Sequence, residues 1–153
     1  MQALELRIPP PVVALLLAIA MWGISRFFMP AAVPWPARVL IAAVIALPGL
    51  GIAVSGAVAF RRAKTTVNPM KPEATSSLVT SGIYRFTRNP MYVGLLCLLT
   101  AWAVLLGAPL AFVGPVIFVP YMNRFQIVPE ERALAALFAT DYAAYKARVR
   151  RWL

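Results

Sequence analysis

The stretch from Val39 to Phe60, VLIAAVIALPGLGIAVSGAVAF, is the strongest indication of the fold class because it contains no charged residue. At about 1.5 Å per helical residue it can cross the roughly 30 Å hydrocarbon core of a bilayer. The chain of 153 residues has the same character throughout, with 61% apolar and 13% charged residues, whereas a soluble domain has about 25% charged residues. We therefore predict an all-α fold, built as an integral membrane helical bundle.

Three further apolar runs complete the predicted bundle. The last two are separated by Gly107, Ala108 and Pro109, which predicts a short helical hairpin. Either this hairpin stops short of the outer face of the membrane, or its second arm continues past Asn123 and Arg124. The predicted elements of this single domain, 1–153, are four spans at about 9–28, 39–60, 91–106 and 110–128, a loop at 61–90 and a C-terminal amphipathic cytoplasmic helix at 129–153.

Basic residues are distributed unevenly along the chain, which has a net charge of +10 and no histidine. All but three of the 15 Lys and Arg residues lie in segments 61–88 and 124–151, and the positive-inside rule places such segments on the cytoplasmic side. With four spans both termini are then cytoplasmic, and we expect the inner (plasma) membrane of a prokaryote. Because the basic residues flank apolar runs, we expect contact with a membrane and no nucleic-acid partner.

The composition argues against metal chemistry. The chain has one cysteine, Cys97, and it lies within an apolar run. Structural and catalytic zinc sites draw mainly on several Cys and His side chains, so we expect no metal. Cys97 is then predicted to serve as a small buried hydrophobic residue.

The first motif that could carry chemistry lies just before and within the third predicted span. It includes Arg88, Asn89, Pro90, Tyr92 and Gly94. The pattern alone also fits a juxtamembrane belt, in which Arg and Tyr anchor the chain at the interface and Pro opens a helix.

Two more motifs follow the fourth span. Glu130 and Glu131 are adjacent after Pro129, so they could begin a helix and complement its dipole. They could equally bind an ammonium group, a sulfonium group or ribose hydroxyls. Asn123 and Arg124 suit an anion clamp or a helix end whose arginine reaches the interface.

The order and spacing of these motifs resemble one family. The stretch 82–94, then Arg124, Glu130 and Glu131, and then Phe138 with 142–146, is similar to the superfamily of integral membrane methyltransferases. That superfamily includes isoprenylcysteine carboxyl methyltransferase and the phospholipid N-methyltransferases. The likeness covers about the last half of the chain.

Upstream, Gly49-Leu50-Gly51 is similar to a Gly-x-Gly sequence of the phospholipid enzymes, although a glycine pair in a span often serves helix packing instead. Ala139 stands where many members have glycine, and Asn89 stands where many carboxyl methyltransferases have histidine. Such departures concern the substrate more than the cofactor.

The resemblance implies S-adenosylmethionine as the cofactor and assigns roles to individual residues. Tyr142 and Tyr145 would pack the C-terminal helix over the cofactor pocket. Arg124 would sit at the reaction centre or clamp a substrate anion. The implied catalytic residues are Asn123 and Arg124, and the implied cofactor-binding residues are Gly49, Gly51, Arg88, Asn89, Pro90, Tyr92, Gly94, Glu130 and Glu131.

The substrate implied by the resemblance is a lipid-like or apolar small molecule, reached from the cytoplasmic membrane face. If both glutamates hold the cofactor, few bases remain to deprotonate an ammonium group. We therefore expect a carboxylate or thiolate acceptor slightly more than an amine. The alternative from another class is a non-enzymatic membrane scaffold or lipid-binding protein, because anionic lipid could occupy the basic segments.

Overall fold

The computed structural model describes residues 5–28, 32–63 and 77–153. These residues form helices joined by short turns and contain no strand, which confirms the predicted all-α fold for the described part of the chain. Lys64 and Lys71 of the predicted basic loop lie outside the described residues.

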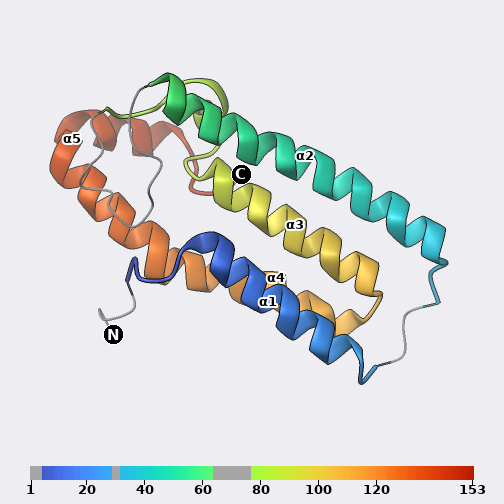
Figure 1. The fold of residues 1–153 in the computed structure, drawn as a ribbon. Coiled ribbons are helices and arrows are strands. Elements are labelled where there is room, and N and C mark those ends of the chain that lie inside the picture. Colours follow the sequence, from blue (N-terminus) through green and yellow to red (C-terminus); the bar gives the residue numbers. More distant parts are fainter. Residues whose placement is uncertain (1–4, 29–31, 64–76) are drawn as a thin grey trace.

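Four helices lie side by side along most of the molecule (Figure 1). Each coincides with a predicted apolar run, and the ends differ by a few residues. α2 packs mainly on α3, while α1 packs on α3 and α4. The four helices are α1 (Pro10–Ser25), α2 (Trp35–Arg62), α3 (Pro90–Leu106) and α4 (Val113–Met122).

Among the described helices, α2 is the one long and apolar enough by itself to cross a membrane. α1 and α3 are apolar but shorter. Both α2 and α3 begin with a proline in the first turn, where its missing N–H costs no helical hydrogen bond. α3 ends at Gly107, whose φ of 67° terminates the helix. The Arg38 side chain from α2 then donates hydrogen bonds to the free carbonyls of Leu105 and Leu106.

The structure shows how the chain continues after α3. A short turn, η4 (Pro109–Phe112), leads into α4. α4 then continues through a π-helical turn, η5 (Asn123–Ile127), directly into α5 (Val128–Arg148). The second arm therefore continues past Asn123 and Arg124, and it carries the helix as far as the predicted cytoplasmic segment.

α5 is bent, and it ends earlier than the predicted helix at 129–153. The bend is at Ala139, which has φ 31° and ψ −103° inside the helix. After Arg148 the chain is no longer helical, and residues 149–153 return toward the beginning of α3. Part of the apolar face of α5 packs inward, because Leu134 and Phe138, together with Val149 after the helix, surround the buried Tyr142 and Tyr145, whereas Leu137 is exposed.

α2 and α3 approach each other closely because small residues line their contact. A Cβ atom added at Gly94 would lie 2.5 Å from the Cβ of Ala53 and 2.6 Å from the carbonyl oxygen of Gly49. Such distances are well inside van der Waals contact, so any side chain at Gly94 would push the helices apart.

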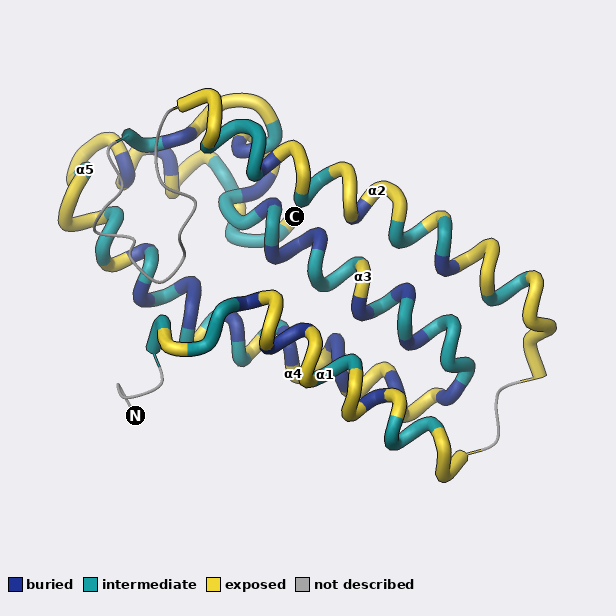
Figure 2. Tube along the Cα trace, viewed as in Figure 1, coloured by how far each residue is buried: buried dark blue, intermediate teal, exposed yellow. Residues whose placement is uncertain are grey.

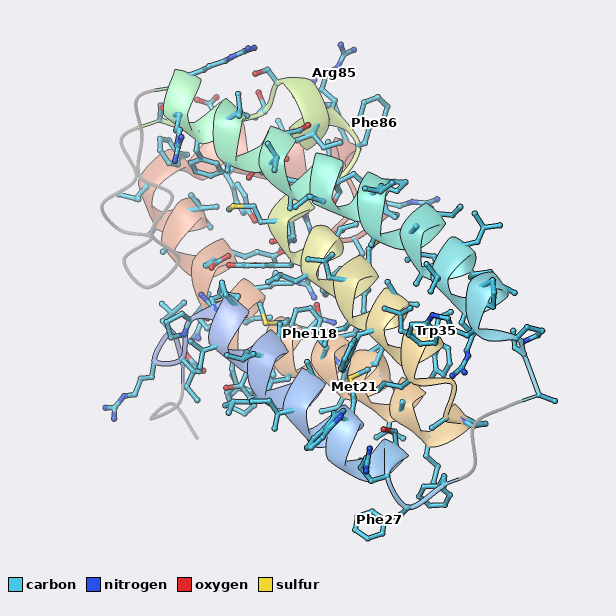
Figure 3. The ribbon with its side chains drawn as sticks, turned by 45° about the vertical axis from the view of Figure 1, so that its right-hand side comes forward. Met21, Phe27, Trp35, Arg85, Phe86 and Phe118 are labelled. Carbon is cyan, nitrogen blue, oxygen red and sulfur yellow. The ribbon has the colours of Figure 1, made fainter. Side chains whose placement is uncertain are left out.

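Buried residues lie where the four helices face one another, and exposed residues lie on the outer sides (Figure 2). Many of the exposed residues are large and apolar. Met21 and Phe118 are fully buried in the core, whereas Phe27 and Trp35 point outward near one end of the bundle (Figure 3). Leucine and valine side chains are also exposed on the outer faces of the helices. They include Leu15, Leu16, Leu40, Val44, Leu47 and Val116.

Candidate active site

Most of the polar residues that the sequence singles out meet at one end of the bundle. A 3-10 turn, η3 (Gly82–Arg85), leads to Asn89, which caps the beginning of α3. The π-helical turn η5 and the first turn of α5 face it. The C-terminal segment 150–152 passes between them, so three parts of the chain far apart in sequence contribute to one polar cluster.

Glu130 forms the centre of the first half of this cluster. Its Oε1 atom accepts a hydrogen bond from the Tyr92 hydroxyl at 2.5 Å and another from Nε2 of Gln126 at 2.8 Å. The pKa of Glu130 is raised to about 7, chiefly by burial and also by the neighbouring Glu131, while the two hydrogen bonds oppose the rise. Both donors reach the same oxygen, and among the described residues no hydrogen bond to Oε2 is present.

Glu131 lies in a different environment, because its charge is already compensated within the protein. Arg88 donates to it at 3.0 Å, Arg151 donates to both of its oxygens at 3.1 and 2.7 Å, and the Lys146 ammonium is 3.7 Å away. The side chains of Glu131 and Arg88 are only 10% and 9% exposed. Glu131 therefore holds α3, α5 and the C-terminal segment together.

Asn89 is held by the C-terminal segment as well. Its amide Nδ2 donates to the carbonyl of Arg151 at 2.8 Å, and its backbone N–H donates to the hydroxyl of Thr87 at 3.1 Å. That hydroxyl donates in turn to the carbonyl of Arg151, and the backbone N–H of Arg88 donates to the carbonyl of Arg150. The entrance to α3 is thus tied to the last residues of the chain.

Asn123 and Arg124 both lie on the π-helical turn, but their side chains have different partners. Asn123 accepts a hydrogen bond from the indole of Trp152 at 3.1 Å, so it belongs to the cluster. The guanidinium of Arg124 pairs with Glu5 at 2.6 Å, and Arg132 pairs with the same carboxylate. The structure therefore does not bring Arg124 into contact with Glu130 or Glu131, and its catalytic role stays a prediction.

The predicted glycines and Pro90 are distributed along α2 and α3. Gly49 and Gly94 face each other in the close contact between the helices, and Pro90 packs under Gly56. A Cβ atom added at Gly51 would meet no atom within 4 Å, so Gly51 faces away from α3. Helix packing accounts for the contacts of Gly49 and Gly94, and a role of these glycines in binding a cofactor stays a prediction.

Five residues of this cluster were not among the predicted site residues. They are Thr87, Gln126, Lys146, Arg151 and Trp152. Gln126 did leave a signal, since it is a polar residue in an apolar run, one helical turn before Glu130. Arg151 and Trp152 left none, because nothing local predicts that the chain folds back after α5.

The fold and the cluster define a class of protein: an all-helical chain that carries a buried carboxylate, tyrosine and amide cluster at one end of its bundle. The family model described as "Phospholipid methyltransferase" matches residues 37–141, which include most of α2, all of α3, and Glu130 and Glu131. The chain belongs to this phospholipid methyltransferase family, as its motifs predict.

Other comparisons add little about activity. An uncharacterized protein of Haemophilus influenzae is 48% identical over 63 residues, which is 41% of this chain and 100% of that protein. No solved structure matches the chain. Family membership indicates methyl transfer, and lipid-like substrates are typical of such a family.

Proposed function

We propose that this protein transfers a methyl group from S-adenosylmethionine to a lipid-like or apolar acceptor at the cytoplasmic face of a membrane. One observation carries the proposal. Glu130, Tyr92, Asn89 and Glu131, from two distant parts of the sequence, converge at one end of the helical bundle in a chain of the phospholipid methyltransferase family.

The residues present fit the charges of S-adenosylmethionine. The cofactor has a sulfonium and an ammonium group, and Glu130 offers a partly buried carboxylate whose Oε2 is free of the bonds made by Tyr92 and Gln126. The cofactor also has a carboxylate, and Arg88, Lys146 and Arg151 supply more positive charge than Glu131 neutralises. When bound, the cofactor would supply an electrophilic methyl group.

Glu130 is the residue that we expect to bind a cationic ligand, and Glu131 is the residue that positions the surrounding arginines. Tyr92 and Gln126 orient the Glu130 carboxylate by their hydrogen bonds. Asn89 and Asn123 hold the C-terminal segment beside it. This arrangement limits the access of water to the carboxylate, which strengthens its attraction to a cation.

The membrane location is supported by the apolar surface of the helices. α2 can cross a bilayer, and large hydrophobic side chains such as Leu40, Val44 and Leu47 are more than 60% exposed on it. Exposed apolar surface of this extent needs a covering that water does not provide. We propose that all four predicted spans lie in the membrane, with the polar cluster and both termini on the cytoplasmic side.

The first and last described residues are consistent with this topology. The backbone N–H of Leu6 donates to the carbonyl of Phe125 in η5 at 3.0 Å, and the segment 150–152 contacts the beginning of α3. Both ends of the described chain therefore lie at the end of the bundle that carries the cluster.

The class of acceptor depends on whether a base is present. The pKa of about 7 gives Glu130 the capacity to accept a proton near neutral pH. An amine acceptor would be as compatible with the cluster as the carboxylate or thiolate expected from the sequence only where Glu130 serves as the base and does not pair with the cation of the cofactor. The pH dependence of the rate separates amines and thiols from carboxylates, because only amines and thiols need to lose a proton before attack.

A transfer assay tests the proposal. Purified protein in lipid nanodiscs is incubated with methyl-labelled S-adenosylmethionine and with lipid amines, prenyl thiols or fatty carboxylates, and label is counted in the organic phase. We expect label to enter one of these classes. If a folded sample that binds the cofactor labels none of them, the lipid-like acceptor is wrong; if it does not bind the cofactor, the protein is better described as a scaffold or lipid-binding protein.

A further inference from the structure

A polar pocket of about 350 Å³ lies between the segment before α3 and the end of α5. It shares no lining residue with the Glu130 and Glu131 cluster. Its volume is that of a small ligand site. The lining residues are Thr80, Ser81, Arg85, Tyr145, Arg148 and Val149.

The two arginines of this pocket have no acidic partner among the described residues. The ion pairs of the described chain use Arg88, Arg124, Arg132, Lys146 and Arg151 instead. The Nε of Arg148 donates to the carbonyl of Ala144, and no hydrogen bond occupies the Nη atoms. Among the described residues, the lining thus presents two guanidinium groups and no carboxylate, so it favours an anion.

The other walls supply hydroxyl groups and an apolar surface. The hydroxyls of Thr80 and Ser81 can donate to an oxyanion. Tyr145 donates its own hydroxyl to the carbonyl of Tyr84 at 2.8 Å, so its ring contributes shape rather than a free donor. Two arginines with two hydroxyls are a donor set suited to phosphate.

The surroundings of the pocket indicate which kind of phosphate it meets. Arg85 and Phe86 lie together at the outer edge of the bundle, beside the end of α2 (Figure 3). The Phe86 side chain is 70% exposed, and η3 packs on the same helix that carries the long apolar surface. Exposed aromatic and basic side chains at the end of a spanning helix are typical of the headgroup region.

We propose that this pocket binds the phosphate of an anionic phospholipid headgroup, with Arg85 and Arg148 as its charged ligands. Thr80 and Ser81 complete the oxyanion contacts, and Phe86 rests in the adjoining acyl region. The proposal rests on the membrane location of the proposed function, and it does not depend on methyl transfer.

The test measures thermal unfolding of the purified full chain in a neutral detergent. The added ligands are dihexanoyl phosphatidylglycerol and dihexanoyl phosphatidylcholine, each below its critical micelle concentration, and inorganic phosphate. We expect saturable stabilisation by phosphatidylglycerol, and much weaker effects of the other two. The double variant Arg85→Gln/Arg148→Gln should need about a hundred times more phosphatidylglycerol, since each of the two lost charge-assisted hydrogen bonds weakens binding by about tenfold.

A matched control separates this pocket from general surface charge. Arg62→Gln/Arg150→Gln removes the same charge from exposed positions outside the pocket, and it should leave the affinity unchanged. Equal losses in the two double variants, or equal effects of phosphatidylglycerol and phosphatidylcholine, would overturn the proposal. An equal effect of inorganic phosphate would overturn the lipid as its ligand.

A second readout uses the wild-type protein alone and so does not depend on the variants folding. Native mass spectrometry from mixed-lipid micelles should show one retained phosphatidylglycerol per chain, and retention of phosphatidylcholine in the same proportion would contradict the site. Binding of S-adenosylmethionine to the same sample is measured in parallel. Failure of this sample to bind S-adenosylmethionine would count against the proposed enzyme without affecting the lipid site.

Discussion

Replacing Glu130 by glutamine should separate cofactor binding from folding. The amide of glutamine is the same size as the carboxyl group, and its oxygen can still accept from the Tyr92 hydroxyl and from Gln126. The variant therefore loses a negative charge and little else. It should bind S-adenosylmethionine less tightly while keeping the same helical structure.

The magnitude follows from the environment of the carboxylate. A hydrogen bond or close contact to a charged group contributes about 1.5–3 kcal/mol, which corresponds to a dissociation constant that is roughly 10 to 150 times larger in Glu130→Gln at pH 8. With a pKa of about 7, Glu130 in the free protein is about nine-tenths ionised at pH 8 and about one-tenth ionised at pH 6. Wild-type affinity should therefore fall about tenfold over that range, and the variant should show no such fall.

The stability of the wild-type protein should change with pH in the direction opposite to its affinity for S-adenosylmethionine. The folded protein raises the pKa of Glu130 from its ordinary value of 4.5 to about 7, so folding favours the protonated form. The wild-type protein then loses stability as the pH rises from about 4.5 through 7, because the buried carboxyl must ionise in the folded state. The variant escapes this loss, and at pH 8 it should unfold at the same temperature as the wild type or higher.

Calorimetric titration and thermal unfolding at pH 6, 7 and 8 provide both readouts. Asp141→Asn is the matched control, because it makes the same chemical change at an exposed position of α5; it should behave like the wild type. Unchanged affinity in Glu130→Gln, or affinity lost together with helical structure, would refute the reasoning.

Three further substitutions, one of them with a matched control, test how the fold is stabilised. Glu131→Gln should lower the free energy of unfolding by about 3 kcal/mol, because it leaves the buried Arg88 guanidinium without its counter-ion; no change in a denaturant titration would show that water replaces the carboxylate. Gly94→Ala should lower the free energy of unfolding by about 1–3 kcal/mol, because the added methyl group pushes α2 away from α3. The matched control is Gly51→Ala, which has open space around it and should leave the free energy of unfolding unchanged or slightly higher in the same titration. Ala139→Gly should raise the unfolding temperature, corresponding to about 1 kcal/mol, because glycine adopts the positive φ at the bend without steric cost; a lower unfolding temperature would mean that the bend carries no strain.

The helices could be predicted from sequence because their signals are local. Uncharged apolar runs, prolines at the first turn and Gly107 after α3 mark the ends of helices within a few residues. The bend at Ala139 was harder to predict, since alanine normally favours a straight helix. The resemblance supplied the one hint, because glycine is common there in the family.

The candidate site was predictable in its residue types but not in its partners. Adjacent glutamates beside a membrane segment drew attention to Glu130 and Glu131 equally, yet the fold gives them different neighbours. The partner of Arg124 is Glu5, which lies 119 residues away in sequence. Arg151 reaches Glu131 only because the chain turns back after α5, and no local pattern reports such a return.

The central claim is that the cluster around Glu130 binds S-adenosylmethionine, and calorimetric titration of the wild-type protein in lipid nanodiscs tests it most directly. The account predicts saturable binding of one S-adenosylmethionine per chain, and competition by S-adenosylhomocysteine, which lacks the sulfonium charge and should bind less tightly at pH 8. No binding of either molecule, by protein shown to be helical and cooperatively folded in both detergent and nanodiscs, would contradict the claim.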